Sequence, residues 1–181
     1  MRFLKDADID PAPLANRKVA IIGFGNQGRA QALNLNDSGI DVVVALRDGS
    51  TTRNEVESAG LSIGSLRDAA ERADVVMMLA PDEVHHSIYE EIEPHLKADA
   101  ALGFSHGLSI RFGFVKPRAD LDIFMIAPKG PGTALRSLYM NDEGMIGLWA
   151  VEQDASGQAR NIALAYGRAI GCGRARSRAI A

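Results

Sequence analysis

The segment G-F-G-N-Q-G at residues 23–28 restricts the fold of this chain more than any other feature of its sequence. It directly follows Lys18–Ile22, an apolar, β-branched run that is typical of a strand buried on both faces of a parallel sheet. A helix is predicted to begin at about Asn26. Between such a strand and helix, the three glycines allow a tight turn, a close approach to a pyrophosphate and close helix–strand packing. The segment therefore predicts a dinucleotide-binding loop with its anion at a helix N-terminus.

Short apolar runs alternate with amphipathic stretches along the rest of the chain, which is typical of βαβ units over a parallel sheet. The predicted further strands are 41–46, 74–79, 100–104, 122–127 and 146–151, and the predicted helices include 54–59, 65–72, one starting near Pro81, and one after Ser156. Ser65 and Ser156 are the expected N-caps of their helices. We expect a three-layer, Rossmann-type α/β fold with a doubly wound, mainly parallel sheet over residues 1–171, followed by a frayed, arginine-rich tail at 172–181.

Composition and charge exclude several classes of function. The formal net charge of -3 provides no field that would attract nucleic acid or an anionic membrane. Cys172 is the one cysteine, so an internal disulfide is impossible, and we expect it to be an ordinary small residue. No apolar run approaches the length of a membrane span, and the N-terminus lacks the apolar core of a signal peptide. These observations predict a cytoplasmic protein.

The end of the second predicted strand bears on which nicotinamide cofactor would bind. Sites for NAD tend to place an acidic residue there to bind the ribose 2′-hydroxyl. This chain has Arg47, whose planar guanidinium suits a phosphate, and the hydroxyls of Ser50 and Thr52 follow it. The group favours NADPH. Asp48 would repel a phosphate if it pointed inward, and an ordinary polar loop remains the alternative interpretation.

An ordered series of motifs in this chain resembles the N-terminal domain of ketol-acid reductoisomerase, the acetohydroxyacid isomeroreductase of branched-chain amino-acid (valine and isoleucine) synthesis. The series extends to about Gly171 and consists of D-A-D at 6–8, G-F-G-N-Q-G at 23–28, L-N-D-S-G at 35–39, L-R-D-G-S at 46–50, P-D-E at 81–83, I-E-P at 92–94, F-S-H-G at 104–107, A-P-K-G-P-G at 127–132 and Q-D-A-S-G at 153–157.

The resemblance implies an oxidoreductase activity and a set of site residues. The family rearranges a 2-acetyl-2-hydroxy acid such as 2-acetolactate with Mg²⁺ and then reduces the product with NADPH to a 2,3-dihydroxy acid. His106 matches the active-site histidine, and Lys129 lies in a neighbouring loop that faces substrate and nicotinamide. The implied cofactor contacts are Gly23, Phe24, Gly25, Asn26, Gln27, Gly28, Arg47, Ser50, Thr52, Asp82, Glu83, Val84, His85 and Gly132.

His106 is also plausible on physical grounds. It follows a strand predicted to end at Phe104, so it belongs to the carboxyl edge of the sheet, where open α/β folds bind ligands. An imidazole there can relay a proton or stabilise developing charge near neutral pH. The other histidines, His85, His86 and His95, have helix-surface interpretations, and of these His85 alone falls at a cofactor-facing position.

The chain departs from the family pattern in two respects. Ser109 and Arg111 replace an asparagine and a histidine, Thr133 replaces a histidine, and His85 replaces a glutamine. The resemblance also implies an all-helical C-terminal domain that supplies the acidic Mg²⁺ ligands, and we expect this domain to be absent, because the chain ends before it. The scattered Asp and Glu of the chain offer no candidate pair of Mg²⁺ ligands.

Three functions are therefore compared. The chain is the cofactor half of the enzyme and inactive alone, or a diverged free-standing NADPH-binding module without catalysis, or a β-hydroxyacid dehydrogenase. The last is disfavoured by the P-K-G-P-G segment and the S-H-G order. The expected partner is a small-molecule substrate of the 2-acetolactate class, with no nucleic acid and no membrane, and a homo-oligomer stays open.

Overall fold

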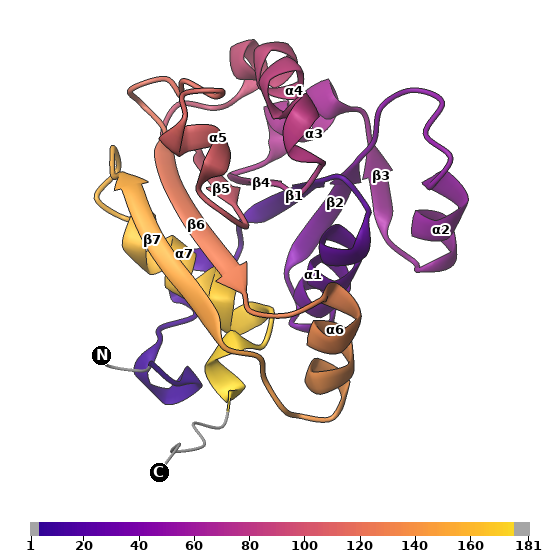
Figure 1. The fold of residues 1–181 in the computed structure, drawn as a ribbon, viewed down its shortest axis with the longest axis vertical. Helices are drawn as coiled ribbons and strands as arrows, with labels where there is room; N and C mark the ends of the chain where they lie inside the picture. Colours follow the sequence, from indigo (N-terminus) through magenta and orange to yellow (C-terminus); the bar gives the residue numbers. More distant parts are fainter. Residues whose placement is uncertain (1–3, 176–181) are drawn as a thin grey trace.

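Buried apolar residues form the centre of the sheet in the computed structural model, which describes residues 4–175 (Figure 1). β1 (Lys18–Ile22) pairs with β4 (Val75–Met78), and only Lys18 of these nine residues is not buried. The remaining strands are β2 (Asp41–Ala45), β3 (Ser62–Gly64), β5 (Ala101–Phe104), β6 (Asp122–Pro128) and β7 (Gly147–Gln153). The strand order is β3-β2-β1-β4-β5-β6-β7, and all neighbours are parallel except β6 and β7.

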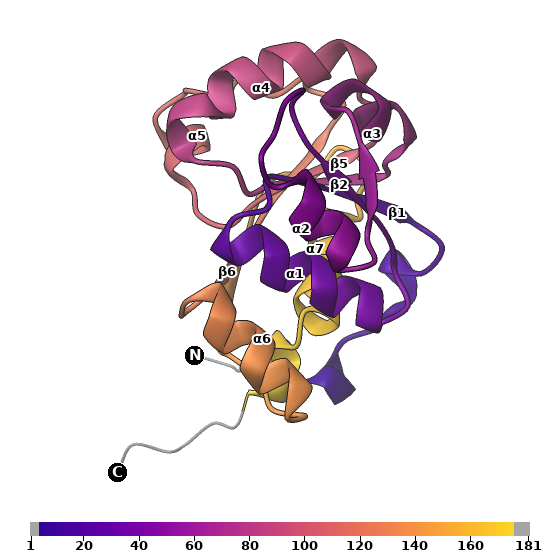
Figure 2. The same ribbon diagram turned by 90° about the vertical axis from the view of Figure 1, so that its right-hand side faces the viewer.

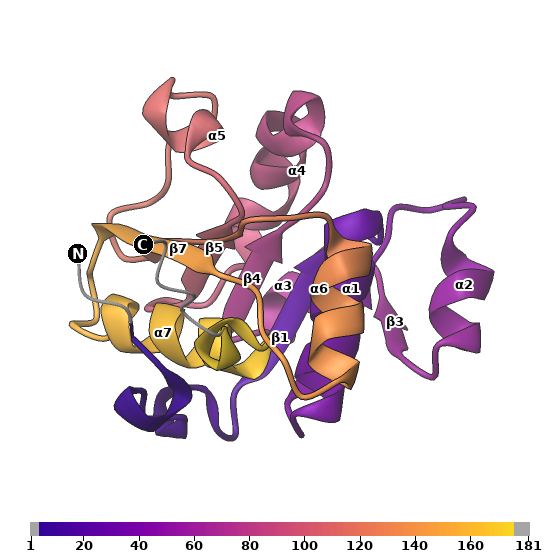
Figure 3. The ribbon, with the colours of Figure 1, turned by 60° about the horizontal axis from the view of Figure 1, so that its bottom comes forward.

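Helices cover both faces of this sheet, as Figure 2 shows. One face carries α3 (Leu66–Arg72) and α4 (His85–Ile92), whose apolar side chains share a core cluster with Ala20, Val76 and Leu102. The opposite face carries α1 (Asn26–Asp37), α2 (Arg53–Ser58), α6 (Gly132–Met140) and α7 (Ala159–Ala169), and in Figure 3 α1 and α6 lie side by side. The short α5 (Leu108–Arg111) follows β5, and 3-10 turns occupy Asp6–Asp8, Ala12–Leu14, Asp82–Val84, Glu93–His95 and Cys172–Arg174.

The strand order confirms the predicted Rossmann-type, doubly wound fold. The order changes direction between β1 and β4, and open α/β sheets bind ligands at the carboxyl ends of the strands beside such a point. The segments that follow these two strands are the glycine loop at 23–28 and the turn that begins at Leu79. Topology therefore selects one end of the sheet for the site.

One of the two predicted helix N-caps is confirmed and the other is wrong. Ser65 is the N-cap of α3, and its hydroxyl accepts a hydrogen bond from the Asp68 amide at 3.0 Å, as predicted. The prediction that Ser156 caps the last helix is wrong, because α7 begins at Ala159. Ser156 instead donates its amide and its hydroxyl to the carboxylate of Asp122, which is fully buried. A buried carboxylate needs such donors, so the tertiary contact outweighs the local cap.

The start of the predicted tail belongs to the packed part of the chain. Gly173 is buried against Asp6, and Arg174 lies 4.5 Å from the ring centre of Tyr139. Burial raises the pKa of the Cys172 thiol to about 12, which agrees with an inert, structural cysteine. The rest of the predicted tail, 176–181, lies outside the described residues.

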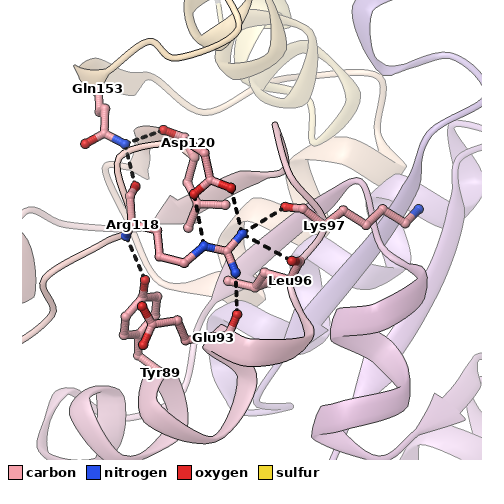
Figure 4. Close-up of polar contacts among 8 residues, drawn as sticks. Tyr89, Glu93, Leu96, Lys97, Arg118, Asp120 and Gln153 are labelled. Carbon is pink, nitrogen blue, oxygen red and sulfur yellow. Dashed lines mark hydrogen bonds and ion pairs between the residues drawn. The ribbon is translucent and has the colours of Figure 1, made fainter.

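Arg118 connects the segment between α5 and β6 to the residues that directly follow α4 through hydrogen bonds (Figure 4). Its guanidinium donates to both carboxylate oxygens of Asp120 at 2.9 Å, to the Glu93 carbonyl at 2.7 Å and to the Leu96 carbonyl at 3.2 Å. The hydrogen bond from Arg118 holds the pKa of Asp120 below its ordinary value. The backbone amide of Arg118 donates to the Tyr89 hydroxyl. Burial raises the pKa of that tyrosine. This network thus fixes the loop that follows the His106 region.

Candidate functional site

The glycine loop has the shape that the sequence predicts. Gly23 adopts φ +95°, and a Cβ there would lie 2.8 Å from the Ala80 amide nitrogen. A Cβ on Gly28 would overlap the carbonyl oxygen of Gly23, so this residue allows α1 to pack closely on the loop. A Cβ on Gly25, in contrast, would meet no protein atom within 4 Å. Two glycines are thus required by the protein's own packing, while the third borders open space.

The N-terminus of α1 offers hydrogen-bond donors at this open space. The first N–H groups of a helix have no partner within the helix, and Gly25, its N-cap, provides no side chain to accept from them. The helix runs for 12 residues, which is long enough for its dipole to favour an anion at this end. The combination of free amides and an unobstructed Gly25 fits a pyrophosphate.

Side chains of the loop connect it to the segment between β6 and α6. The Asn26 side-chain oxygen accepts from the Gly132 amide, and the Gln27 amide nitrogen donates to the Gly130 carbonyl at 2.9 Å. The glycine at 132 is required because a Cβ there would overlap the Asn26 carbonyl. Phe24 is buried in the core. The predicted cofactor contacts of these residues stay predictions, and the structure gives Asn26, Gln27 and Gly132 an additional role in joining two loops.

A series of buried hydrogen bonds connects this junction to the core. Gln31 is fully buried, accepts from the Tyr166 hydroxyl at 2.8 Å and donates to Gln27 at 3.0 Å. It therefore links α7 through α1 to the glycine loop. Neither Gln31 nor Tyr166 is a predicted site residue. They lie far apart in the sequence, so no local pattern could predict their contact.

The loop after β2 holds the three side chains predicted to bind a 2′-phosphate. The hydroxyls of Ser50 and Thr52 lie 2.9 Å apart, and the Ser50 amide donates to the Arg47 carbonyl at 3.1 Å. Arg47 is exposed, and no side-chain partner for its guanidinium occurs within residues 4–175. Asp48 is exposed too. The structure thus leaves a guanidinium without an internal counter-charge at the end of β2.

The predicted catalytic residues lie on the loops after β5 and β6. The exposed His106 has its Nε2 atom 3.0 Å from a carboxylate oxygen of Asp82, so the carboxylate can orient the ring. Lys129 is exposed, and its amide donates to the Ile146 carbonyl at 2.8 Å. Because β5 and β6 are adjacent and parallel, both side chains belong to the carboxyl edge of the sheet.

His85 differs from its expected placement. The helix-surface interpretation is wrong for this residue, which is 3% exposed, although it holds for His86. Its Nδ1 lies 2.7 Å from the Ser109 hydroxyl and its Nε2 lies 2.8 Å from the Ala80 carbonyl. The predicted contact of His85 with a cofactor is untested, and in this structure both ring nitrogens are already engaged. Glu83 is exposed and Val84 is half-buried in the same turn.

Two further properties of the described residues bear on function. Within residues 4–175 there is no group of three or more His, Cys, Asp or Glu side chains that could hold a metal ion, so these donors do not fit Mg²⁺. No helix in the same range combines the length and the apolar character that crossing a membrane requires.

Comparisons with known proteins agree with this geometry. Residues 13–176 match the family described as acetohydroxy acid isomeroreductase, NADPH-binding domain. The structure of an NADH-preferring ketol-acid reductoisomerase from an uncultured archean superposes with a TM-score of 0.92 at 42% identity. That match covers 96% of this chain and 54% of the other, so the chain spans about half the length of its relative.

More distant structures share the fold alone. A semialdehyde dehydrogenase NAD-binding protein from Cupriavidus necator has a TM-score of 0.72 at 22% identity, covering 86% of this chain and 60% of that one. Mycobacterium tuberculosis 3-hydroxyisobutyrate dehydrogenase has a TM-score of 0.64 at 15% identity, covering 88% and 53%. The β-hydroxyacid dehydrogenase alternative is therefore set aside. The extent of the family match and the 42% identity establish that this chain belongs to the ketol-acid reductoisomerase family, as its cofactor-binding domain.

Proposed function

We propose that the chain binds NADPH, with the pyrophosphate above Gly25 at the N-terminus of α1. The observation that carries this proposal is the contrast among the loop glycines: Gly23 and Gly28 are needed by protein contacts, whereas Gly25 faces empty space beside unpaired amides. In this reading the adenosine end reaches the loop after β2, and the nicotinamide end reaches the turn after β4. Bound there, NADPH supplies a hydride for the reduction of a 2-keto acid.

The preference for NADPH over NADH rests on Arg47. Its unpaired guanidinium can donate two hydrogen bonds to a 2′-phosphate, and the adjacent hydroxyls of Ser50 and Thr52 can donate to the same group. The relative from the uncultured archean is NADH-preferring, so the family contains both specificities, and the loop after β2 of this chain must be tested directly.

We expect Arg47→Ala to weaken NADPH binding by about 10- to 100-fold, since a charge-assisted hydrogen bond contributes about 1.5–3 kcal/mol. NADH affinity should change less than about threefold, because NADH has no 2′-phosphate. Fluorescence titration of the reduced cofactors measures both constants. His106→Ala is the control, and its affinity for NADPH should match that of the parent. Equal affinities of the parent for the two cofactors would refute the assigned role of Arg47.

We further propose that the chain is the reductase half of a ketol-acid reductoisomerase acting on 2-acetolactate or a close analogue in the cytoplasm. His106, oriented by Asp82 through Nε2, would exchange a proton at Nδ1, which in this structure accepts a long hydrogen bond from the Leu108 amide at 3.4 Å, and Lys129 would supply positive charge to the developing oxyanion. The alkyl migration requires Mg²⁺ as a Lewis acid, and the described residues do not fit that ion. We therefore assign its ligands to a segment or subunit outside residues 4–175.

The 181-residue chain, mixed with NADPH, Mg²⁺ and 2-acetolactate, should consume no cofactor above the rate without substrate. The decrease in NADPH absorbance is the measurement, and a full-length ketol-acid reductoisomerase is the positive control. Turnover by the purified chain would show that it supplies its own metal ligands.

The second candidate function is an NADPH-binding module without catalysis, which the departures at Ser109, Arg111 and Thr133 favour. Both candidates predict cofactor binding by this chain. Adding a helical domain from a relative distinguishes the two candidate functions, because only a competent cofactor half would then turn over 2-acetolactate.

A further inference from the structure

Four polar side chains lie one after another between the core and the proposed active site. The Ser109 hydroxyl contacts Nδ1 of His85 at 2.7 Å, and that nitrogen lies 3.6 Å from Oδ1 of Asp82. Oδ2 of Asp82 in turn pairs with Nε2 of His106 at 3.0 Å. Ser109 and His85 are buried, whereas 52% of the His106 side chain is exposed. The series thus connects a buried pair to an accessible imidazole.

The hydrogen bonds of His85 fix the position of one ring proton and, for a neutral ring, the tautomer. A carbonyl oxygen only accepts, so the bond to Ala80 requires the proton on Nε2. In the neutral ring Nδ1 is then an acceptor, and the Ser109 hydroxyl must donate to it. With Nδ1 supplied by Ser109, His85 has no proton to offer Asp82, and at 3.6 Å the two groups are beyond hydrogen-bond distance. The Asp82 carboxylate therefore pairs with His106 and not with His85.

The bond to Ala80 extends the series to the dinucleotide loop. Gly23 approaches Ala80 so closely that a Cβ would lie 2.8 Å from the Ala80 nitrogen. The ring of His85 also packs on Phe104, the last residue of β5, with ring centres 5.8 Å apart. His85 therefore joins the turn after β4 to the loop after β5, and its partner Ala80 lies against Gly23 of the dinucleotide loop.

We propose that His85 and Ser109 are positioning residues, which reserve the Asp82 carboxylate for His106 by holding His85 in its neutral Nε2–H form. The role rests on the proposed function of His106. Both residues depart from the family pattern, and in this structure each is a hydrogen-bond partner of the other. A glutamine at 85 could also donate to Ala80 and accept from Ser109, which explains why either side chain can occupy this place.

The test is the protonation of the imidazole nitrogens, read from ¹⁵N chemical shifts of the whole chain at pH 7.5. In the parent, His85 should have a protonated Nε2 and an unprotonated Nδ1. Ser109→Ala removes the donor, so His85 should gain a proton on Nδ1 directed at Asp82, and the His106 Nε2 resonance should move. Ser87→Ala is the matched control, because the exposed Ser87 lies on α4 with His85 and its hydroxyl donates to the Val84 carbonyl. His85→Gln should leave the His106 resonance within the change that the control produces.

A merely structural role would lower the melting temperature of Ser109→Ala and leave His106 unmoved, which would overturn the proposal. A parent His85 with its proton on Nδ1 would overturn it as well, even if Ser109→Ala failed to fold. An NADPH titration of the parent runs alongside. Failure to bind would refute the proposed function, whereas the nitrogen shifts judge the positioning role independently.

Discussion

Gly25→Ala should abolish most NADPH binding without unfolding the protein, whereas Gly28→Ala, three residues later, should damage the fold itself. A Cβ on Gly25 meets nothing within 4 Å, and φ of −76° is open to alanine, so the folded chain accommodates it. The same methyl would occupy the space assigned to the pyrophosphate. Overpacking of this kind costs about 1–3 kcal/mol, which corresponds to a loss in NADPH affinity of about 5- to 150-fold.

The methyl group on Gly28 would overlap the carbonyl oxygen of Gly23, and neither partner is a flexible side chain. Helix α1 must move away from β1, so we expect about 3 kcal/mol of destabilisation and a melting temperature lower by roughly 6–12 °C. Thermal unfolding followed by circular dichroism, with cofactor titration at a temperature where each variant is folded, separates the two effects. If Gly25→Ala binds NADPH as the parent does, the space above Gly25 is not the pyrophosphate site.

The sequence predicted the parts of the fold that depend on local pattern. β1, β4 and β6 are long apolar runs between turn residues, and their predicted and observed bounds agree within one residue at each end. β3 was not predicted, because Ser62–Gly64 is short and only partly apolar and pairs only through its position beside β2. The helix α6 was missed as well: it begins at Gly132, a residue whose place is set by the approach of Asn26 from another loop.

In the candidate site, too, the features that could be predicted are those formed by contiguous residues. The glycine loop and Arg47 could be identified because strand, loop and helix are contiguous in the sequence. The pairing of Asp82 with His106, and the burial of His85 against Ser109, join residues about 24 positions apart, and no periodicity reports such contacts. Departures from the family pattern at 85 and 109 were visible in the sequence, whereas the hydrogen bond that joins these residues is visible only in the structure.

Arg118→Ala should be the most destabilising of the surface-loop substitutions. The variant loses the bonds to Asp120 and to the carbonyls of Glu93 and Leu96, which hold the 112–121 segment against the end of α4 (Figure 4). About 27% of the side chain is exposed, so water can reach part of the site, and we expect a loss of about 2–4 kcal/mol. Arg118→Lys should recover little, because an ammonium cannot reproduce the planar fork.

Arg67→Ala is the matched control, since Arg67 pairs with Glu71 at 3.1 Å on an exposed helix face and should contribute less than about 0.5 kcal/mol. The expected difference also depends on pH. Arg118 lowers the pKa of Asp120 from 3.8, so that stabilisation is present above pH 3.8 and is lost as the pH falls through the lower value in the folded chain. Denaturant unfolding at pH 7 and pH 3 should therefore show a smaller gap between parent and Arg118→Ala in acid, with the carbonyl bonds keeping it above zero. A gap that is unchanged at pH 3 would mean that the carbonyl contacts alone hold this segment.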